Sequence, residues 1–363
     1  MFHSIPKVYM PRLDRLYHRL RPRQQRVELD LAMIQEILAE YEFELTHPPD
    51  TLTGGNRSYS LILATSHGKK ILKKYKNSLG KSTILQEHSI LTYLAQINFS
   101  SSRLASTRTG QTLVCRDEQH YALFDFIEGG FQYHNYILLP GQARQFVTIA
   151  AEILAILHDA LKDFVPQGYN PDGFKSKNED RTRNLEWLIN KFRYCVEQTS
   201  RQGNNKAAWL LEQAPYFEKS VTQLEAKLKD APLPRLIIHA DYGPYNLLFR
   251  DNGPPIVLDF EMARLDWRVT ELIDVWYRFC YDKLGFKINK MKYLLEAYQI
   301  HFPLTKDELY YIPDVWKFWN IWRCILNWHN YCETQSDVAL AKAQQNLDFV
   351  NWMTVHQSNL DFL

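Results

Sequence analysis

The sequence has few of the features that mark several large classes of protein. Its five cysteines are scattered through 363 residues, and none belongs to a C-x-x-C pair. This pattern argues against a disulfide framework or a structural zinc site and favours a reducing, cytoplasmic location. The H-E-x-x-H motif of metallopeptidases and the G-x-S-x-G motif of serine hydrolases are also missing.

Long hydrophobic runs are missing as well. The sequence has no apolar run of about eighteen residues, so we predict no membrane span. Its first residues lack the apolar core of a signal peptide. A net charge of +2 gives no overall electrostatic case for binding nucleic acid. What is present, 45% hydrophobic and 23% charged residues, is ordinary for a globular chain long enough to form two cores.

Positive charge is concentrated near the N-terminus. Residues 1–26 carry seven Lys or Arg side chains against one acid, Asp14, so the rest of the chain is net acidic. Three interpretations fit: a basic surface helix that touches an anionic partner or a membrane surface, a transit peptide, or an extension packed on the next domain. Asp14 and the scarcity of serine argue against a transit peptide. We favour the packed extension, with the anionic partner as the alternative.

The most informative segment runs from His239 to Glu261. It contains the pattern H-x-D-x-x-x-x-N, formed by His239, Asp241 and Asn246, and then an apolar strand that ends in Asp259-Phe-Glu. A buried strand is predicted at 236–238. Two more, at 247–249 and 256–258, are joined by an Asp-Asn-Gly-Pro turn. Taken singly, each polar residue is a common cap, turn former or core histidine. Together they place two carboxylates and an amide at strand ends.

Weaker signals lie earlier in the chain. Gly54-Gly55-Asn56 stands between apolar runs, where glycines let backbone N–H groups approach an anion, although Gly-Gly is also an ordinary hairpin turn. Lys73 follows an apolar pair in the next predicted strand. Lys70 or Lys74 takes its place if the register differs.

A helix is predicted over residues 81–95, with Glu87 on it as a partner for Lys73. The commoner fate of a helical Glu is exposure. Gly80-Lys-Ser-Thr looks like the end of a Walker A loop, but Tyr75 stands where that loop needs glycine. We therefore predict that Ser82 or Thr83 caps the helix.

With these residues in view, the chain resembles the aminoglycoside phosphotransferase, choline kinase and homoserine kinase family, the small-molecule branch of the protein-kinase-like fold. The resemblance covers roughly residues 50–280. It rests on Gly54–Asn56, Leu72-Lys73, Glu87, Tyr121–Gly129, Leu154–His158, His239–Asn246 and Leu258–Ala263.

This resemblance implies an α+β, two-lobed, protein-kinase-like fold with a small β-rich N-lobe and a larger, mostly helical C-lobe. We predict three parts. They are a basic extension with a first helix over residues 1–40, the N-lobe over 41–128, and the C-lobe with the catalytic loop and acceptor site over 129–363.

The family also implies the activity: an ATP-dependent small-molecule kinase that moves the γ-phosphate to a hydroxyl of an amino alcohol, a homoserine-like amino acid, a sugar or an aminoglycoside. Asp241 is implied as the base, on a loop held by His239, and Asn246 and Asp259 as ligands of Mg²⁺. The implied ATP-binding residues are Gly54, Gly55 and Asn56 over the phosphates, Lys73 held by Glu87, and the hinge Asp125, Phe126 and Ile127.

Three further predictions concern the C-terminal part. Residues 271–275 look like the family's short acidic element, which implies that Asp274 braces the catalytic loop. For His158 we favour a structural hydrogen bond over catalysis. Trp316, Trp319 and Trp322 share a helix face, and we favour core packing over a cage for a quaternary ammonium group.

Two other functions compete with the small-molecule kinase. One is a catalytically silent member of the fold, a binding or spore-coat-type structural protein, but Asp241, Asn246 and Asp259 are all retained. The other is a protein kinase. This is disfavoured because Glu261 replaces the glycine of Asp-Phe-Gly and no Ala-Pro-Glu segment follows.

Overall fold

The computed structural model describes residues 30–51, 58–77, 79–130, 132, 140–167, 185–202, 206–250, 253–282 and 285–360. The basic segment 1–26 and the Gly54-Gly55-Asn56 turn lie outside these residues. The chain forms two compact units, which we describe separately. Unit 1 comprises Met1–Ala143, Val165–Asp172 and Asp241–Ala263, and unit 2 comprises Arg144–Phe164, Gly173–Ala240 and Arg264–Leu363.

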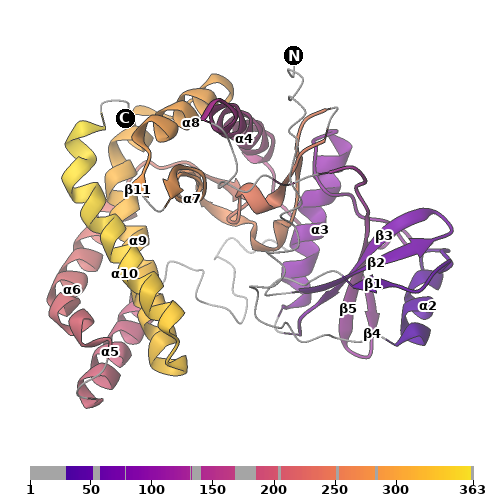
Figure 1. Ribbon diagram of the computed structural model, residues 1–363, viewed down its shortest axis with the longest axis horizontal. Coiled ribbons are helices and arrows are strands. Elements are labelled where there is room, and N and C mark those ends of the chain that lie inside the picture. The colour runs from indigo at the N-terminus through magenta and orange to yellow at the C-terminus, as the bar shows by residue number, and fades with distance from the viewer. Residues whose placement is uncertain are drawn as a thin grey trace. The chain divides into compact units, whose positions relative to one another are not determined.

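Unit 1 is built on a five-stranded antiparallel sheet with the order β1-β2-β3-β5-β4 (Figure 1). Its strands are β1 (Asp50–Thr51), β2 (Ser58–Thr65), β3 (Gly68–Tyr75), β4 (Val114–Arg116) and β5 (Gln119–Asp125). Helix α2 (Leu31–Ala39) precedes the sheet, and helix α3 (Lys81–Gln96) lies between β3 and β4 in the chain. The predicted strand that carries Lys73 and the helix predicted over residues 81–95 are confirmed as β3 and α3.

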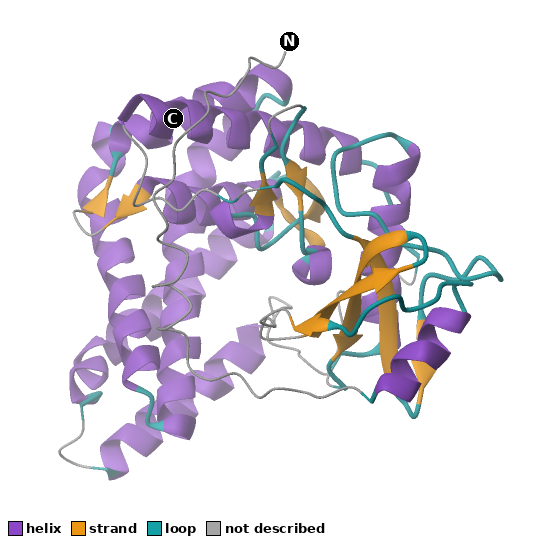
Figure 2. Ribbon diagram, turned by 45° about the vertical axis from the view of Figure 1, so that its right-hand side comes forward, coloured by secondary structure: helices purple, strands orange, loops and turns teal. Residues whose placement is uncertain are grey.

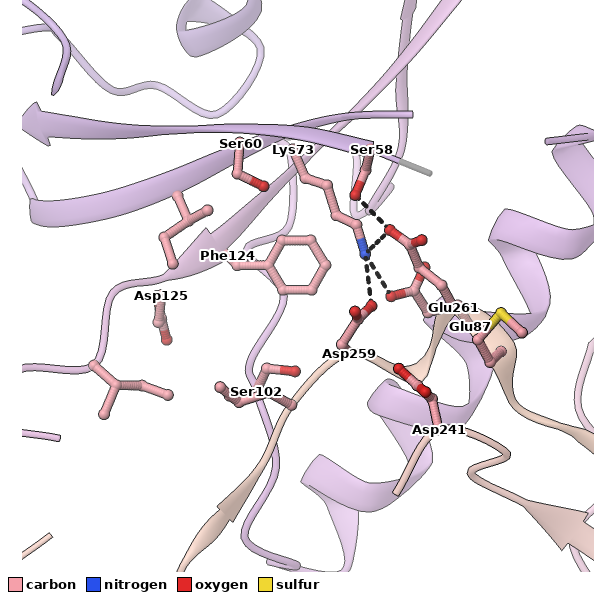
Figure 3. Close-up of a pocket in the computed structure, with 14 residues that line it drawn as sticks. Ser58, Ser60, Lys73, Glu87, Ser102, Phe124, Asp125, Asp241, Asp259 and Glu261 are labelled. Atoms are coloured by element: carbon pink, nitrogen blue, oxygen red, sulfur yellow. Dashed lines mark hydrogen bonds and ion pairs between the residues drawn. The ribbon is translucent and has the colours of Figure 1, made fainter. Parts of the chain in front are cut away.

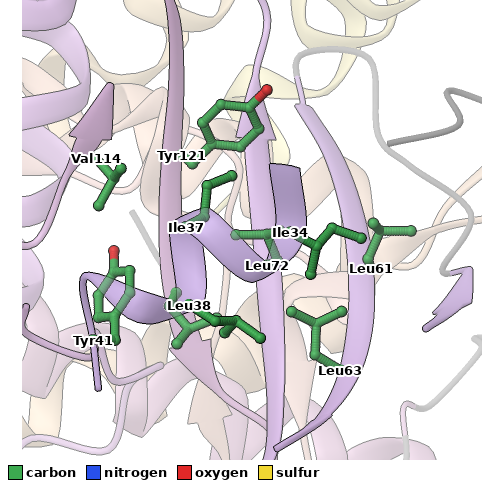
Figure 4. Packing of buried hydrophobic residues seen from close by; sticks show 10 residues of the cluster. Ile34, Ile37, Leu38, Tyr41, Leu61, Leu63, Leu72, Val114 and Tyr121 are labelled. Carbon is green, nitrogen blue, oxygen red and sulfur yellow. The ribbon is translucent and has the colours of Figure 1, made fainter. Parts of the chain in front are cut away.

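The two helices cover opposite faces of the sheet because side chains alternate along each strand. Leu72 packs in a buried cluster with Ile37 and Leu38 of α2 (Figure 4). Its neighbour Lys73 points the other way and meets Glu87 of α3. One face is thus an apolar core, and the other carries polar groups.

The third segment of unit 1 holds the predicted hairpin. Strands β7 (Leu247–Leu248) and β8 (Ile256–Val257) pair antiparallel, flanked by the short helices η2 (Pro244–Asn246) and η3 (Phe260–Met262). The Val257 N–H donates to the Ser100 carbonyl at 2.9 Å, and the Ser102 N–H donates to the Val257 carbonyl at 3.1 Å. These bonds tie the hairpin to the chain that follows α3.

Unit 2 is mainly helical (Figure 2). Within it, α9 packs against α5, α6, α7 and α10. Its helices are most of α4 (Pro140–Leu161), α5 (Leu185–Arg201), α6 (Ala208–Lys229), α7 (Arg268–Cys280), α8 (Ile288–His301), α9 (Lys306–Thr334), α10 (Asp337–His356) and η4 (Gln357–Asn359). Among the described residues, no helix is both long enough and apolar enough to span a membrane.

Two short strand pairs complete unit 2. The strand predicted at 236–238 is confirmed as β6 (Arg235–Ile238), which pairs antiparallel with β9 (Arg264–Trp267). Strand β10 (Tyr281–Asp282) pairs with β11 (Gly285–Phe286). Strands β6 and β9 therefore flank in the chain the segment that carries the sequence motif.

The aromatic residues of α9 mostly fill the core of unit 2. Trp316 and Trp322 are buried, which confirms the predicted packing role for these two rings. Trp319 is partly exposed: its Nε1–H donates to Asp274, and the Arg323 guanidinium lies 5.0 Å from its ring centre.

The start of α3 corrects one prediction. The N-cap is Gly80, without a side-chain hydrogen bond, so neither Ser82 nor Thr83 caps the helix. A capping side chain belongs to the residue just before the first helical one, with extended backbone, and Gly80 has ψ 147°. Ser82 and Thr83 already lie within the first turn.

Candidate functional site

A cavity of about 650 Å³ lies entirely within unit 1 (Figure 3). This volume falls in the range of small-molecule sites. The cavity joins the polar face of the sheet to the motif-bearing segment. Its lining residues are Ser58, Ser60, Ile71, Lys73, Glu87, Ser102, Phe124, Asp125, Ile127, Asp241, Leu258, Asp259, Glu261 and Met262.

Lys73 is the central cation of this cavity. Its Nζ lies 3.0 Å from Glu87 Oε1, 2.6 Å from Glu261 Oε1 and 3.7 Å from Asp259 Oδ1 (Figure 3). The strand register therefore brings Lys73 to Glu87, whereas Lys70 pairs with Asp125 at 2.7 Å. Lys73 is 8% exposed, so these contacts are shielded from solvent.

The cluster carries more negative than positive charge, which shifts its pKa values. Burial alone would lower the pKa of Lys73, but Glu87, Tyr75, Glu261 and Asp259 raise it well above its ordinary value. Burial raises the pKa of Glu87 to about 7, against the opposing effect of Lys73, and repulsion from Glu261 and Asp259 adds to the rise. Lys73 thus stays charged, and a further cation would stabilise the carboxylates around it.

Glu261 is a site residue to which the sequence reasoning assigned no role. It is buried, and the Ser58 hydroxyl donates to its Oε1 at 2.6 Å, the same oxygen that meets Lys73. Its signal was present as the third residue of Asp-Phe-Glu. The motif alone could not show its direction, which depends on the left-handed backbone of Asp259 (φ 61°) and the η3 turn that follows.

Asp241 and Asn246 are joined across the motif loop. The Asn246 Nδ2 donates to the Asp241 carbonyl at 2.9 Å and to Asp241 Oδ2 at 3.0 Å. This leaves the amide oxygen of Asn246 as its possible metal ligand. Asp241 and Asp259 both line the cavity, and the Asp259 side chain is 47% exposed.

The backbone before Asp241 is held by Glu271, not by Asp274 as predicted. In unit 2, the N–H groups of His239 and Ala240 both donate to the Glu271 carboxylate. Asp274 instead accepts from Trp319 and Arg323 of α9. Glu271 and Asp274 lie about one helical turn apart on α7, and the earlier of the two contacts the backbone before Asp241.

His158 has the structural role that we predicted. It is fully buried, with Nε2 2.8 Å from Glu271 Oε2 and Nδ1 2.7 Å from the Tyr298 hydroxyl. Burial alone would raise the pKa of Glu271, but the hydrogen bond and charge of His158, and then the interactions with His239, lower it. Glu271 is therefore held as a carboxylate that accepts hydrogen bonds.

Of the predicted hinge residues, Asp125 ends β5, and Phe126 and Ile127 follow it. Asp125 and Ile127 line the cavity. The Asp125 N–H donates to the Arg103 carbonyl at 2.9 Å, and the Phe126 N–H donates to the Lys69 carbonyl at 3.3 Å. The backbone N–H groups of Asp125 and Phe126 are thus already engaged by neighbouring backbone carbonyls.

The described residues contain no cluster of three or more His, Cys, Asp or Glu side chains suited to hold a metal ion. Asp259 and Asn246 supply two oxygen ligands at most from the predicted set. Mg²⁺ is commonly bound by one or two protein ligands together with substrate phosphates and water. The donor set therefore fits a metal that arrives with a nucleotide.

Comparisons with known proteins agree with this geometry. Residues 51–293 match the model of the family described as "Phosphotransferase enzyme family". A homoserine kinase of Caulobacter vibrioides (strain NA1000 / CB15N) is 25% identical over 266 residues, covering 71% of this chain and 74% of the relative.

Solved structures with the same fold include two small-molecule kinases. An amicoumacin kinase in complex with AMP-PNP and Ca²⁺ has a TM-score of 0.65 at 15% identity, covering 89% of this chain and 94% of that one. A choline kinase from Cryptosporidium parvum Iowa II has a TM-score of 0.58 at 13% identity, covering 92% and 98%.

Proposed function

This chain belongs to the phosphotransferase enzyme family and is a small-molecule kinase, and from that premise we propose that it transfers the γ-phosphate of ATP to a hydroxyl group. The predicted α+β, protein-kinase-like fold is confirmed by the solved structures. The nucleotide, the residue roles and the acceptor are the proposal.

One observation carries it: a single cavity gathers the Lys73–Glu87 ion pair with the carboxylates of Asp241 and Asp259. Phosphoryl transfer needs positioning and charge stabilisation more than covalent chemistry from the protein. A buried lysine can meet phosphate oxygens, and carboxylates can hold a metal and orient an attacking hydroxyl. The cavity holds both kinds of group.

In the proposed mechanism, Asp241 accepts a hydrogen bond from the acceptor hydroxyl, orients it and takes its proton. Asn246 keeps that carboxylate in place through its Nδ2–H bond. Lys73, held by Glu87, meets the phosphate oxygens, and Gly54, Gly55 and Asn56 cover them. Of the hinge Asp125, Phe126 and Ile127, the Ile127 N–H and the backbone carbonyls meet the adenine edge, because the other two N–H groups are already engaged.

Asp259 and the amide oxygen of Asn246 would hold Mg²⁺. When bound, the ion neutralises charge on the phosphate groups. The excess of carboxylates around Lys73 is consistent with this role, because the cluster gains stability from a second cation. A bound metal would also relieve the repulsion that Glu87 feels from Asp259.

Homoserine is the first acceptor to test. The curated relative quoted above acts, by name, on homoserine, and it matches 71% of this chain. Amino alcohols, sugars and aminoglycosides remain in the panel because the fold accommodates all of them. We also propose a cytoplasmic location from the cysteine pattern.

The test is ATP turnover by the purified protein with Mg²⁺, L-homoserine and the acceptor panel. We expect turnover that depends on one acceptor class. Asp241→Ala should lower kcat by roughly 10²–10⁴-fold, the usual contribution of a general base, while the Kd for ATP stays within about threefold. The matched control is Asp159→Asn, an exposed helix residue outside the cavity.

Near-normal kcat in Asp241→Ala would contradict the role of Asp241. ATP binding without turnover on any acceptor would favour the silent binding or structural protein.

A further inference from the structure

A second set of buried polar groups lies behind Glu87, outside the cavity lining. The Tyr75 hydroxyl is 3.0 Å from Glu87 Oε2 and 3.0 Å from His88 Nε2. His88 Nδ1 is 2.8 Å from the Thr112 hydroxyl. Tyr75, Glu87 and His88 are each at most 3% exposed. A continuous hydrogen-bond chain thus links five side chains, in the order Lys73, Glu87, Tyr75, His88 and Thr112.

The chemistry of the donors fixes the order of protons along this chain. Above the Glu87 pKa of about 7, its carboxylate is ionised and can only accept, so the single proton of the Tyr75 hydroxyl points to Oε2. The Tyr75 oxygen then accepts from His88 Nε2–H, which leaves Nδ1 as the acceptor for the Thr112 hydroxyl. This order holds for a neutral His88 with its proton on Nε2, because a charged ring would donate from both nitrogens. Burial and repulsion from Lys73, which lower its pKa to about 3, agree with the neutral form.

We propose that Tyr75 and His88 are positioning residues for nucleotide binding: they aim the Glu87 carboxylate so that Oε1 faces Lys73. This inference rests on the proposed function, and it extends the ion pair by an ordered relay that ends at Thr112, in the chain before β4.

The crowding of Lys73 explains why such a relay matters. Its ammonium group is shared among Glu87, Glu261 and Asp259, and the contact to Glu261 is the shortest of the three. Without the Tyr75 hydroxyl, Glu87 would lose a donor on Oε2 and could turn. Lys73 would then settle toward Glu261, away from the position in which Glu87 supports it.

The experiment compares Tyr75→Phe with wild type. The substitution removes one hydroxyl and keeps the ring. Tyr121→Phe is the matched control, because Tyr121 lies in the same sheet but in the cluster on the α2 face. Thr112→Val removes the hydroxyl at the far end of the hydrogen-bond chain. Thr112 is partly buried, and this variant replaces Tyr75→Phe if that protein folds poorly. The readouts are the Kd for Mg·ATP by calorimetry, KM for each substrate, and the ¹⁵N shifts of the His88 ring.

We expect Tyr75→Phe to weaken Mg·ATP binding by about tenfold, the effect of losing one hydrogen bond to a charged group. KM for the acceptor should stay unchanged. Thr112→Val should shift Kd in the same direction by a smaller factor, and Tyr121→Phe should stay within about twofold. Wild-type His88 should show the Nε2–H tautomer at pH values above the Glu87 pKa of about 7.

Wild-type affinity in Tyr75→Phe, or an Nδ1–H tautomer of His88, would overturn the inference while leaving the proposed function intact. A wild-type protein that binds no nucleotide would overturn the proposed function instead. The tautomer, measured without nucleotide, would then decide alone whether the ordered chain exists.

Discussion

At the residue scale, the main feature of the site is that the buried cluster around Lys73 contains more carboxylates than cations. Lys73 faces Glu87, Glu261 and Asp259 at the same time. Buried charges of one sign repel strongly at low effective dielectric, so the arrangement is stable only with good hydrogen bonds. Ser58 and Tyr75 supply these bonds to Glu261 and Glu87. The hydrogen bond from the Tyr75 hydroxyl therefore helps to stabilise the same buried charges as the Lys73–Glu87 ion pair.

His88 gives a pH-dependent prediction at this scale. Its folded-state pKa of about 3 lies below the ordinary 6.5, because burial and Lys73 disfavour the charged ring. Between these values the unfolded chain binds a proton that the folded protein does not. The free energy of unfolding should therefore fall as the pH drops below 6.5, by up to about 1.4 kcal/mol per pH unit from this group.

Urea unfolding of wild type and His88→Gln between pH 4 and 8 measures this slope. Glutamine cannot titrate, so the two stability curves should run parallel above pH 6.5 and converge below it. Curves that stay parallel down to pH 4 would contradict the buried neutral histidine.

Which residues could be predicted depended on whether a local pattern defines them. Asp241, Asn246, Asp259 and Lys73 stand in short motifs with fixed spacing, and the structure places all of them in unit 1 around one cavity or its loop. Tyr75 and His88 belong to no motif. They meet only because β3 and α3 pack so that the Tyr75 hydroxyl reaches both Glu87 and His88, and sequence spacing does not encode that packing.

At the scale of elements, the acidic segment on α7 was recognised, but the role predicted for Asp274 within it was wrong. The segment lies on a helix, as expected. However, Glu271 accepts from the backbone N–H groups of His239 and Ala240, whereas Asp274, one turn later on the same side of the helix, accepts from α9. Which of two acids one turn apart reaches that backbone depends on how far along α7 the backbone lies, and the local sequence does not reveal it.

Glu271 should therefore control both stability and turnover. Glu271→Gln replaces an acceptor by a group with its own donors beside two buried N–H groups and His158. We expect it to lower the free energy of unfolding by about 1–3 kcal/mol and to lower kcat in the folded fraction. Asp274→Asn, which loses the contacts to α9, should destabilise the protein but leave kcat per folded molecule near wild type. Equal losses of kcat would contradict this division.

Helix α2 tests the other face of the sheet. Ile37 is fully buried against the strands (Figure 4). Ile37→Ala should lower the free energy of unfolding by about 2–5 kcal/mol through lost burial and the cavity left behind. Leu31 on the same helix is 49% exposed, so Leu31→Ala should change it by less than about 0.5 kcal/mol. Equal effects in urea unfolding would contradict the packing of α2.

At the scale of the whole molecule, the division into two units does not follow the order of the chain. The segment Asp241–Ala263 belongs to unit 1, although the strands flanking it, β6 and β9, belong to unit 2. The predicted lobes, residues 41–128 and 129–363, place this segment in the C-lobe because each lobe is one continuous stretch of chain. Those boundaries stay a prediction. Every residue that lines the cavity comes from unit 1, so the proposed nucleotide site is contained in one unit.

This containment predicts how a nucleotide should stabilise the protein. Mg·ATP that binds the folded form alone raises the free energy of unfolding by RT ln(1 + [L]/Kd), about 2.7 kcal/mol at a hundredfold excess over Kd. Because the cavity joins residues 58–127 to 241–262, amide exchange should slow in both segments together. EDTA should remove most of the gain, because without Mg²⁺ the phosphates would meet the carboxylate of Asp259 and the excess negative charge around Lys73. Asp259→Asn should lose the Mg²⁺-dependent part, and Asp159→Asn should keep it. Protection confined to residues 58–127, with no response to EDTA or to Asp259→Asn, would mean that the motif segment takes no part in binding the nucleotide.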